Sequence, residues 1–341
     1  MTSLEGKDIL VTGGCGSIGS RLVQKILAED PSVVRVFDNN EEALFTLQKE
    51  LGDDAPVRYL LGDIRDQDRL ELAVEDIDIV FHAAALKHVT LNEYNPFETV
   101  QTNVNGTQNL IRAALEEEIE SFVGVSTDKA SNPTSVMGAT KLLSERLIIA
   151  ANTYKGSRDT RFGCVRFGNV LGSSGSVVPL FLNQIREGGP VTVTDPEMTR
   201  FIMPIDEAAD LVVEAHDRMT SGEVFVLKMP TFRVGTLAEA MVEEYASKFG
   251  YTSGEIEIDV IGARPGERVH EKLISMDESA QARELEDMYV ILPQIDVSGY
   301  EEVNYSQADL VDGEYTSAGT EHLSKDQIID FVESIEDIPE T

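Results

Sequence analysis

The chain is poor in cysteine and histidine and has no tryptophan. Its 341 residues include two cysteines, Cys15 and Cys164, and five histidines that do not show the spacing of a metal-binding motif. Two cysteines cannot form a disulfide framework, and a cysteine-ligated metal site is not indicated. Because 42% of the residues are hydrophobic, we expect a fold that an apolar core stabilises, without a metal ion.

Long apolar segments are also missing. No apolar run reaches the ~18 residues that a membrane-spanning helix requires. No signal peptide precedes the glycine-rich segment that begins at Gly13. These two absences predict a cytoplasmic protein with no membrane partner.

Basic residues are few. The chain has 28 Lys and Arg against 61 Asp and Glu, which gives a net charge of -33 and a pI near 4.4. This charge disfavours nucleic acid and anionic membranes as partners. Because the acids are spread along the chain, we favour a halophilic protein from a salt-rich cytoplasm, where ions screen self-repulsion. The alternative is simply an acidic protein.

Apolar, β-rich runs alternate with helical patterns over about the first half of the chain. This alternation is typical of an α/β fold with a doubly wound, mostly parallel Rossmann sheet. We expect residues 1–169 to form a dinucleotide-binding type of Rossmann domain, to which the chain returns near residues 191–225. Residues 170–295 would form mainly a smaller substrate-binding lobe. Residues 296–341 would form an acidic extension with one helix, Lys325–Ile335.

A glycine-rich loop follows the first expected strand, Lys7–Thr12. Its three regularly spaced glycines permit a tight turn, close approach of backbone N–H groups to a pyrophosphate, and close packing of the helix on the strand. The next strand ends at Asp38, 19 residues past the last of these glycines, where an acid binds the adenosine ribose hydroxyls. Asp38 would repel a 2′-phosphate, and Asn39 and Asn40 offer no cation, so the pattern favours NAD over NADP. The predicted loop contacts are Gly13, Gly16, Ser17, Ile18 and Gly19.

Two further strands end in residues suited to the same cofactor. The third, Val57–Asp63, ends in an acid that could bind the adenine amino group or cap the next helix. The fourth, Ile77–Ala85, ends in small residues, among them Ala83, that let the backbone approach the cofactor.

Polar side chains follow the expected strand Ser121–Ser126, at the sheet edge where ligands bind in α/β folds. The helix expected next, Thr134–Tyr154, presents two more side chains one turn apart on one face. The alternative is an exposed turn with a solvated charge pair at Asp128 and Lys129, a surface lysine at Lys141 and simple helix packing at Met137. The neighbouring cofactor loop is what favours an active site. The five candidates are Thr127, Asp128, Lys129, Met137 and Lys141.

Motifs between Lys7 and Pro293 resemble those of a known enzyme family. The spacing of TGGCGSIG, GDIRD, HAAALKHV, TNVNGT and STDKA…MGATK is similar to that of extended short-chain dehydrogenases/reductases of the nucleotide-sugar branch. Within that branch, STDKASNP, MGATK, VRFGNVLGSSGSVVP, MTRF and RPGERVHEKLI resemble soluble UDP-N-acetylglucosamine 4,6-dehydratases and their polysaccharide-biosynthesis relatives.

The resemblance implies a reaction cycle on a sugar nucleotide. Such enzymes take a hydride from carbon 4 onto NAD, remove the carbon 5 proton, expel the carbon 6 hydroxyl and return the hydride there. The resemblance gives Thr127 a hydrogen bond to the carbon 4 oxygen, Lys129 the role of base and Asp128 the role of acid. Burial and the Lys141 cation would lower the pKa of Lys129, and desolvation would raise that of Asp128, whereas pairing between them would hold both charged.

Lys141 matches the lysine of the family's YxxxK motif, which implies that it binds the ribose, and Met137 replaces the tyrosine. A thioether cannot serve as the usual proton acceptor, although some dehydratases of this branch are similar in carrying Met there. The group that deprotonates the carbon 4 hydroxyl stays open between Asp128, Lys129 and a water linked to Lys141.

Later segments resemble the family's substrate contacts. The turn Arg166–Asn169 is similar to one that contacts the sugar nucleotide. Arginines in the MTRF and RPGE motifs are candidates for the diphosphate, because a guanidinium matches two phosphate oxygens. The alternative is a surface arginine paired with an acid. The substrate candidates are Lys87, Asn169, Ser176, Val177, Arg200, Arg264 and Glu267, with His88 beside the pocket and Asn103 tying the nearby helix.

The resemblance thus implies NAD-dependent 4,6-dehydration of a UDP-N-acetylhexosamine, with UDP-N-acetylglucosamine as the first candidate. A UDP-sugar 4-epimerase of the same branch is the main alternative, since it forms the same 4-keto intermediate but needs no acid for carbon 6. A non-catalytic NAD-binding regulator is more remote. Family members are commonly homo-oligomers, and we expect one here.

Overall fold

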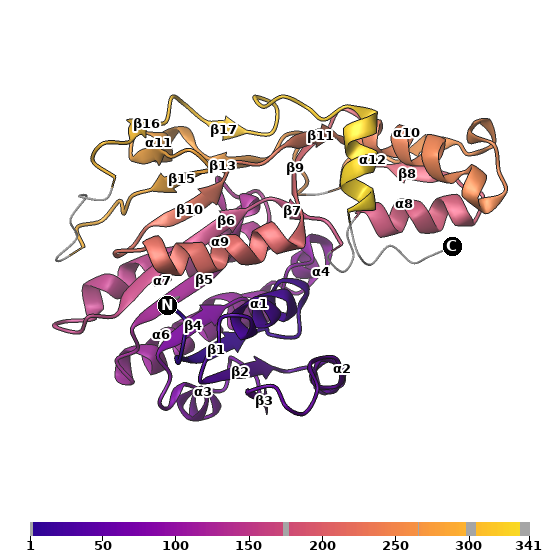
Figure 1. Ribbon diagram of the computed structural model, residues 1–341. Coiled ribbons are helices and arrows are strands. Elements are labelled where there is room, and N and C mark those ends of the chain that lie inside the picture. The colour runs from indigo at the N-terminus through magenta and orange to yellow at the C-terminus, as the bar shows by residue number, and fades with distance from the viewer. Residues whose placement is uncertain (1–2, 173–176, 265, 298–304, 335–341) are drawn as a thin grey trace.

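A computed structural model describes residues 3–172, 177–264, 266–297 and 305–334. Within these ranges ten strands form one sheet, in the order β16-β14-β15-β10-β6-β5-β4-β1-β2-β3 (Figure 1). Their bounds are β1 (Asp8–Thr12), β2 (Val33–Asp38), β3 (Val57–Leu61), β4 (Ile79–His82), β5 (Ser121–Thr127), β6 (Arg161–Phe167), β10 (Val224–Leu227), β14 (Ala282–Glu284), β15 (Met288–Ile291) and β16 (Asp309–Leu310).

The sheet is mostly parallel. From β3 across to β10 every neighbouring pair is parallel, and β15, β14 and β16 then pair antiparallel. Central strands such as β4 are buried along their whole length, because a parallel sheet is covered on both faces. The predicted α/β fold with a doubly wound, mostly parallel sheet is confirmed.

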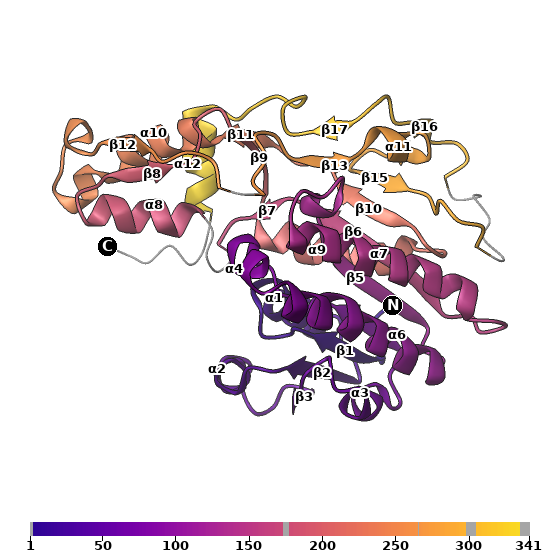
Figure 2. The same ribbon diagram turned by 180° about the vertical axis from the view of Figure 1, so that it is seen from behind.

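Helices cover both faces of the sheet. Helix α9 lies in front of the sheet in Figure 1 and packs on α1, β5 and β6, whereas α6 and α7 lie in front in Figure 2 and α3 packs on α6. The helices of this part are α1 (Ser17–Leu27), α2 (Glu41–Leu51), α3 (Gln67–Val74), α4 (Val89–Tyr94), α5 (Pro96–Thr99), the π-helical η1 (Val100–Gly106), α6 (Thr107–Glu116), the 3-10 turn η2 (Asp128–Ala130), α7 (Val136–Tyr154), α9 (Ile205–Arg218) and α11 (Met276–Ser279).

A smaller lobe has an apolar core of its own, around Phe181, Leu237 and Met241. A three-stranded sheet, β11-β9-β7, lies between it and the main sheet (Figure 1). The elements of this lobe and its junction are β7 (Asn169–Val170), α8 (Val177–Arg186), β8 (Val191–Val193), β9 (Thr199–Met203), β11 (Thr231–Arg233), α10 (Val234–Tyr245), η3 (Ser247–Phe249), η4 (Ser253–Glu255), β12 (Ile258–Val260), β13 (Lys272–Ile274), β17 (Tyr315–Thr316) and α12 (Lys325–Glu333).

The carboxyl-terminal third is shared between the two parts in a way that the sequence did not predict. The chain returns to the main sheet at β10, but β8 pairs with β12 in the smaller lobe. Strands β14, β15 and β16 extend the main sheet, although we had placed them in the lobe and in a separate extension. Helix α12 packs on α10 and so belongs to the lobe. These assignments were wrong because each segment pairs with strands or helices far away in the sequence.

No helix in the described ranges is both long and apolar enough to cross a membrane. Within the same ranges, no group of three His, Cys, Asp or Glu side chains is arranged to hold a metal ion.

Candidate active site

A cavity of about 950 Å³ opens between the carboxyl ends of the sheet strands and the smaller lobe. Asp128 lies behind its wall, and Ser176 lies outside the described residues. The cavity brings together the other predicted site residues, which are Gly13, Gly16, Ser17, Ile18, Gly19, Asp38, Asp63, Ala83, Lys87, Thr127, Lys129, Met137, Lys141, Asn169, Val177, Arg200, Arg264 and Glu267.

The loop between β1 and α1 requires glycine. Gly13 has a φ of +65°, and a Cβ there would lie 2.6 Å from the backbone nitrogen of Ala84. A Cβ on Gly19 would collide with the carbonyl oxygen of Gly13. Gly16 caps α1 without a side-chain hydrogen bond, and backbone N–H groups at such a helix start can bind an anion. The loop therefore fits a pyrophosphate.

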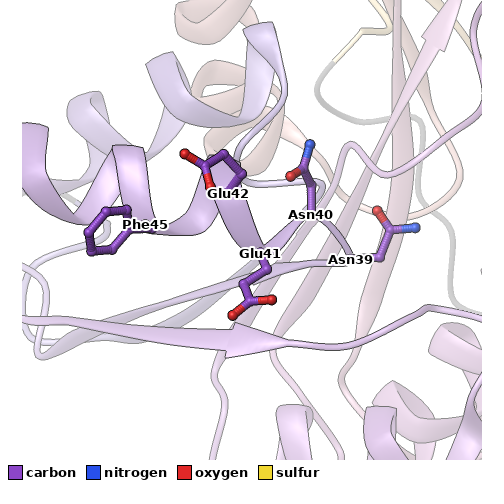
Figure 3. A pocket seen from close by; sticks show the side chains of 5 residues that line it. All are labelled: Asn39, Asn40, Glu41, Glu42 and Phe45. Carbon is purple, nitrogen blue, oxygen red and sulfur yellow. The ribbon is translucent and has the colours of Figure 1, made fainter.

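Asp38 sits at the end of β2 beside this loop. Its Oδ2 accepts a hydrogen bond from the backbone N–H of Cys15 at 3.0 Å, and its Oδ1 accepts one from that of Asn40 at 3.0 Å. Figure 3 shows the side chains that follow it around the start of α2, which are amide, acidic and apolar: Asn39, Asn40, Glu41, Glu42 and Phe45. None of these five carries a positive charge that could bind a 2′-phosphate, so this end of the cavity fits a free ribose.

Asp63 follows β3 and also lines the cavity. Arg65 donates to both of its carboxylate oxygens, from Nε at 3.0 and 2.9 Å, and these bonds lower the pKa of Asp63. Helix α3 is instead capped by Asp66, which accepts from the backbone N–H of Arg69 at 3.1 Å. The helix-cap alternative for Asp63 was therefore wrong.

The segment after β5 forms a tight hydrogen-bonded cluster. The hydroxyl of Thr127 donates to Asp128 Oδ1 at 2.6 Å. Lys129 Nζ donates to both Asp128 oxygens at 3.1 and 3.2 Å. Thr127 and Lys129 face the cavity, whereas Asp128 is only 1% exposed. Asp128 therefore contacts the cavity only through its two neighbours.

The ion pair between Asp128 and Lys129 keeps both side chains charged. Burial by itself would raise the pKa of Asp128, but the Lys129 charge and hydrogen bonds from Glu271, Thr127 and Lys129 outweigh it and lower the value to about 2. Burial by itself would lower the pKa of Lys129, but the Asp128 and Glu271 carboxylates raise it. Of the two effects weighed from the sequence, pairing therefore outweighs burial, because the two groups stabilise each other's charge.

Glu271 completes the cluster, and the sequence analysis missed it as a site residue. Its Oε1 accepts from Lys129 Nζ at 3.1 Å and lies 3.3 Å from Arg200 Nε, and its Oε2 accepts from Asn169 Nδ2 at 3.3 Å. Burial and the Asp128 charge raise the pKa of Glu271 to about 7. Its position inside the RPGERVHEKLI motif was the one available signal, since its partners come from distant segments.

Helix α7 begins after its N-cap residue, Ser135. Met137 and Lys141 project from this helix into the same cavity. Met137 is buried, at 4% exposure. Lys141 Nζ donates to the carbonyl oxygen of Val125 at 2.6 Å, and burial lowers its pKa. This bond holds the ammonium group beside the end of β5.

The two polar ends of the predicted turn, Arg166 and Asn169, lie in different environments. Asn169 lines the cavity, but Arg166 is fully buried behind it and pairs with Glu145 and Glu278. A role for Arg166 in binding the sugar nucleotide is therefore wrong. Lys87 and His88 do line the cavity, and burial lowers the pKa of Lys87.

This combination of fold and site is that of the extended short-chain dehydrogenases/reductases that modify nucleotide sugars. Residues 9–293 match the family described as polysaccharide biosynthesis protein. The chain belongs to this family.

Several known proteins are similar over most of the chain. An uncharacterized membrane protein of Methanocaldococcus jannaschii is 55% identical over 89% of this chain and 91% of its own. A UDP-N-acetylglucosamine 4,6-dehydratase (inverting) of Campylobacter jejuni is 41% identical over 85% and 84%. A UDP-glucose 4-epimerase of Rickettsia rickettsii is 35% identical over 98% and 97%. The crystal structure of Pen from Bacillus thuringiensis is 43% identical, covers 98% of this chain and 99% of its own, and superposes with a TM-score of 0.91.

Proposed function

We propose that this protein catalyses the NAD-dependent 4,6-dehydration of a UDP-N-acetylhexosamine, with UDP-N-acetylglucosamine as the first candidate. The observation that carries the proposal is the Thr127–Asp128–Lys129 cluster, which meets the cavity next to the dinucleotide loop. The similarity to the Campylobacter jejuni dehydratase supports the choice of reaction and substrate.

The cofactor is NAD. Backbone N–H groups at the start of α1 would bind the pyrophosphate, and Asp38 would accept hydrogen bonds from the ribose hydroxyls. Lys141 would bind the second ribose. When bound, NAD accepts a hydride from carbon 4 of the sugar and gives it back at carbon 6.

Thr127 and Asp128 would handle the proton of the carbon 4 hydroxyl. The lowered pKa keeps Asp128 ionised, so that this carboxylate can accept a proton. Because Thr127 already donates to Asp128, it can take the sugar's proton while its own passes to the carboxylate. In the family's YxxxK motif a tyrosine accepts this proton, and the Met137 thioether cannot do so. The route through Thr127 and Asp128 would take its place.

The proton acquired in this way makes Asp128 the acid for the next step. Lys129 removes the carbon 5 proton and the bond from carbon 6 to its oxygen breaks. The hydroxide leaves as water with a proton from the Thr127 hydroxyl, which Asp128 replaces with its own. Lys129 then returns a proton to carbon 5 as carbon 6 is reduced. The sugar loses one water in total, and both side chains end as they began.

A 4-epimerase is the second candidate, because the Rickettsia rickettsii protein of that name is similar over nearly the whole chain. Epimerisation would use Thr127 and Asp128 for the carbon 4 proton and would leave carbons 5 and 6 untouched. Exchange at carbon 5 therefore separates the two reactions.

The test is incubation of the purified protein with NAD and UDP-N-acetylglucosamine in molar KCl and heavy water, followed by NMR. A 6-deoxy-4-keto product with deuterium at carbon 5 supports dehydration, and the same spectrum gives the configuration of that carbon. A galacto-configured product without exchange at carbon 5 would replace it with epimerisation. Binding of NAD without turnover of any UDP-sugar would favour the regulator.

The setting of the enzyme also stays a prediction. We propose that it acts in the cytoplasm and that it assembles as a homo-oligomer.

A further inference from the structure

Lys129 must lose a proton before it can serve as a base, because an ammonium group has no free electron pair. Its pKa is raised, so bulk solvent does not remove that proton near neutral pH. Asp128 already receives the carbon 4 proton in the proposed cycle. A second acceptor within hydrogen-bond distance of Lys129 is therefore needed.

We propose that Glu271 is the positioning residue that takes the extra proton of Lys129 before carbon 5 is deprotonated and returns it afterwards. This inference rests on the dehydratase function proposed above. The catalytic roles proposed above for Thr127, Asp128 and Lys129 leave the Glu271 carboxylate without a function, and this inference assigns it one.

The geometry meets the requirement of a direct transfer. Lys129 Nζ and Glu271 Oε1 lie 3.1 Å apart in a hydrogen bond, so an N–H bond can break while an O–H bond forms without movement of the backbone. Glu271 is 6% exposed, which shields the transferred proton from bulk water. It does not line the cavity itself and thus acts through Lys129.

Opposing effects act on the charge of the Glu271 carboxyl group. Lys129 and Arg200 favour the carboxylate, whereas Asp128 and burial favour the carboxylic acid. Asn169 Nδ2 donates to Oε2 at 3.3 Å and leaves Oε1 to Lys129 and Arg200. These opposing effects bring the pKa to about 7, where either form is accessible at neutral pH.

The proton count sets the expected pH dependence. Below about pH 7 Glu271 is already protonated and Lys129 cannot pass its proton on. Above that pH the pair holds one proton, which can sit on Glu271 while the neutral Lys129 amine removes the proton from carbon 5. Turnover by the wild type should rise as pH increases through this value.

Two measurements on the full-length protein test the inference. In the first, infrared difference spectra of the wild type between acid and alkaline sides of pH 7 should contain a protonated-carboxyl band that Glu271→Gln lacks. In the second, Glu271→Gln should lower kcat by at least about tenfold with little change in KM, slow deuterium entry at carbon 5, and lose the rise in turnover near pH 7. Glu271→Asp, which keeps a carboxyl group, should recover part of kcat and the pH dependence.

Glu314→Gln is the matched control. Glu314 pairs with Lys272, the residue next to Glu271, and lies outside the cavity lining, so its removal should leave kcat and the pH profile unchanged. A wild type that turns over no UDP-sugar would overturn the proposed function and this inference together. Turnover by the wild type with the same pH profile in Glu271→Gln, or an infrared band that persists in that variant, would overturn the inference alone.

Discussion

Arg166 and Glu278 form a buried ion pair that joins β6 to α11. The guanidinium donates to the two carboxylate oxygens at 3.0 and 2.9 Å, and the same arginine pairs with Glu145 on α7 and donates to the carbonyl oxygen of Leu273 at 2.6 Å. Leu273 lies on β13, two residues past Glu271. The bond from Arg166 to Leu273 thus helps to hold the strand that directly follows Glu271.

Removing Arg166 should strongly destabilise the fold. Arg166→Met leaves two buried carboxylates without their cation, so we expect the free energy of unfolding to fall by about 3–5 kcal/mol, measured by urea denaturation in high salt. Glu197→Gln breaks a pair with Arg233 whose side chains are 68% and 47% exposed, and should cost less than about 1 kcal/mol. Equal effects of the two changes would contradict a structural role for the buried pair.

A methyl group on Gly19 should weaken cofactor binding. The new Cβ would collide with Gly13 and lie 2.7 Å from the Cα of Gly14, which forces the loop away from the pyrophosphate. We expect the Kd for NAD of Gly19→Ala to rise at least about tenfold in calorimetric titration. Gly254→Ala is the control, because a Cβ there meets nothing within 4 Å and should leave the Kd unchanged.

Replacing Lys129 should stop chemistry at carbon 5 more than substrate binding. Lys129→Gln keeps a hydrogen-bond donor but has no amine to accept the proton, so kcat should fall by about 10²–10⁴-fold, with deuterium entry at carbon 5 lost in the NMR assay. Lys272→Gln removes a lysine that pairs with Glu314 outside the cavity and serves as the control. Normal exchange at carbon 5 in Lys129→Gln would remove this residue from the role of base.

Glu271 should make the fold less stable as pH rises from 4.5 to about 7. Its pKa is raised in the folded protein from 4.5 to about 7, so its contribution to stability is complete below pH 4.5 and is lost as pH rises through about 7. Asp128 acts oppositely, since its pKa is lowered from 3.8 to about 2 and its contribution is lost as pH falls through that range. Glu271→Gln should therefore flatten the fall in unfolding free energy between pH 4.5 and 7, and an unchanged slope would count against the raised pKa.

Salt should stabilise the protein. At a net charge of -33 the folded chain repels itself, and molar KCl screens that repulsion. We expect the melting temperature to rise steadily between low and molar KCl. Identical melting at both concentrations would leave an acidic protein without the halophilic character that we predict.

A residue's place in the fold could be predicted from the sequence when its partners lie close to it in the chain. The start of α7 could be predicted because the Ser135 cap accepts from Gly138, three residues away. The placement of β14 and β15 could not, because their sheet position depends on pairing of β15 with β10, more than fifty residues earlier. Arg166 illustrates the same limit, since its two acids lie on α7 and α11.

The sequence by itself determined the parallel sheet, the glycine loop, Asp38 and the Thr127–Asp128–Lys129 cluster, because each of these is encoded by apolar periodicity or by spacing within a short segment. Only the tertiary structure decided which groups of the cluster are ionised and that Glu271 joins it. Lys129 and Glu271 are 142 residues apart in the chain, and a pKa depends on burial and on charges that folding alone brings together.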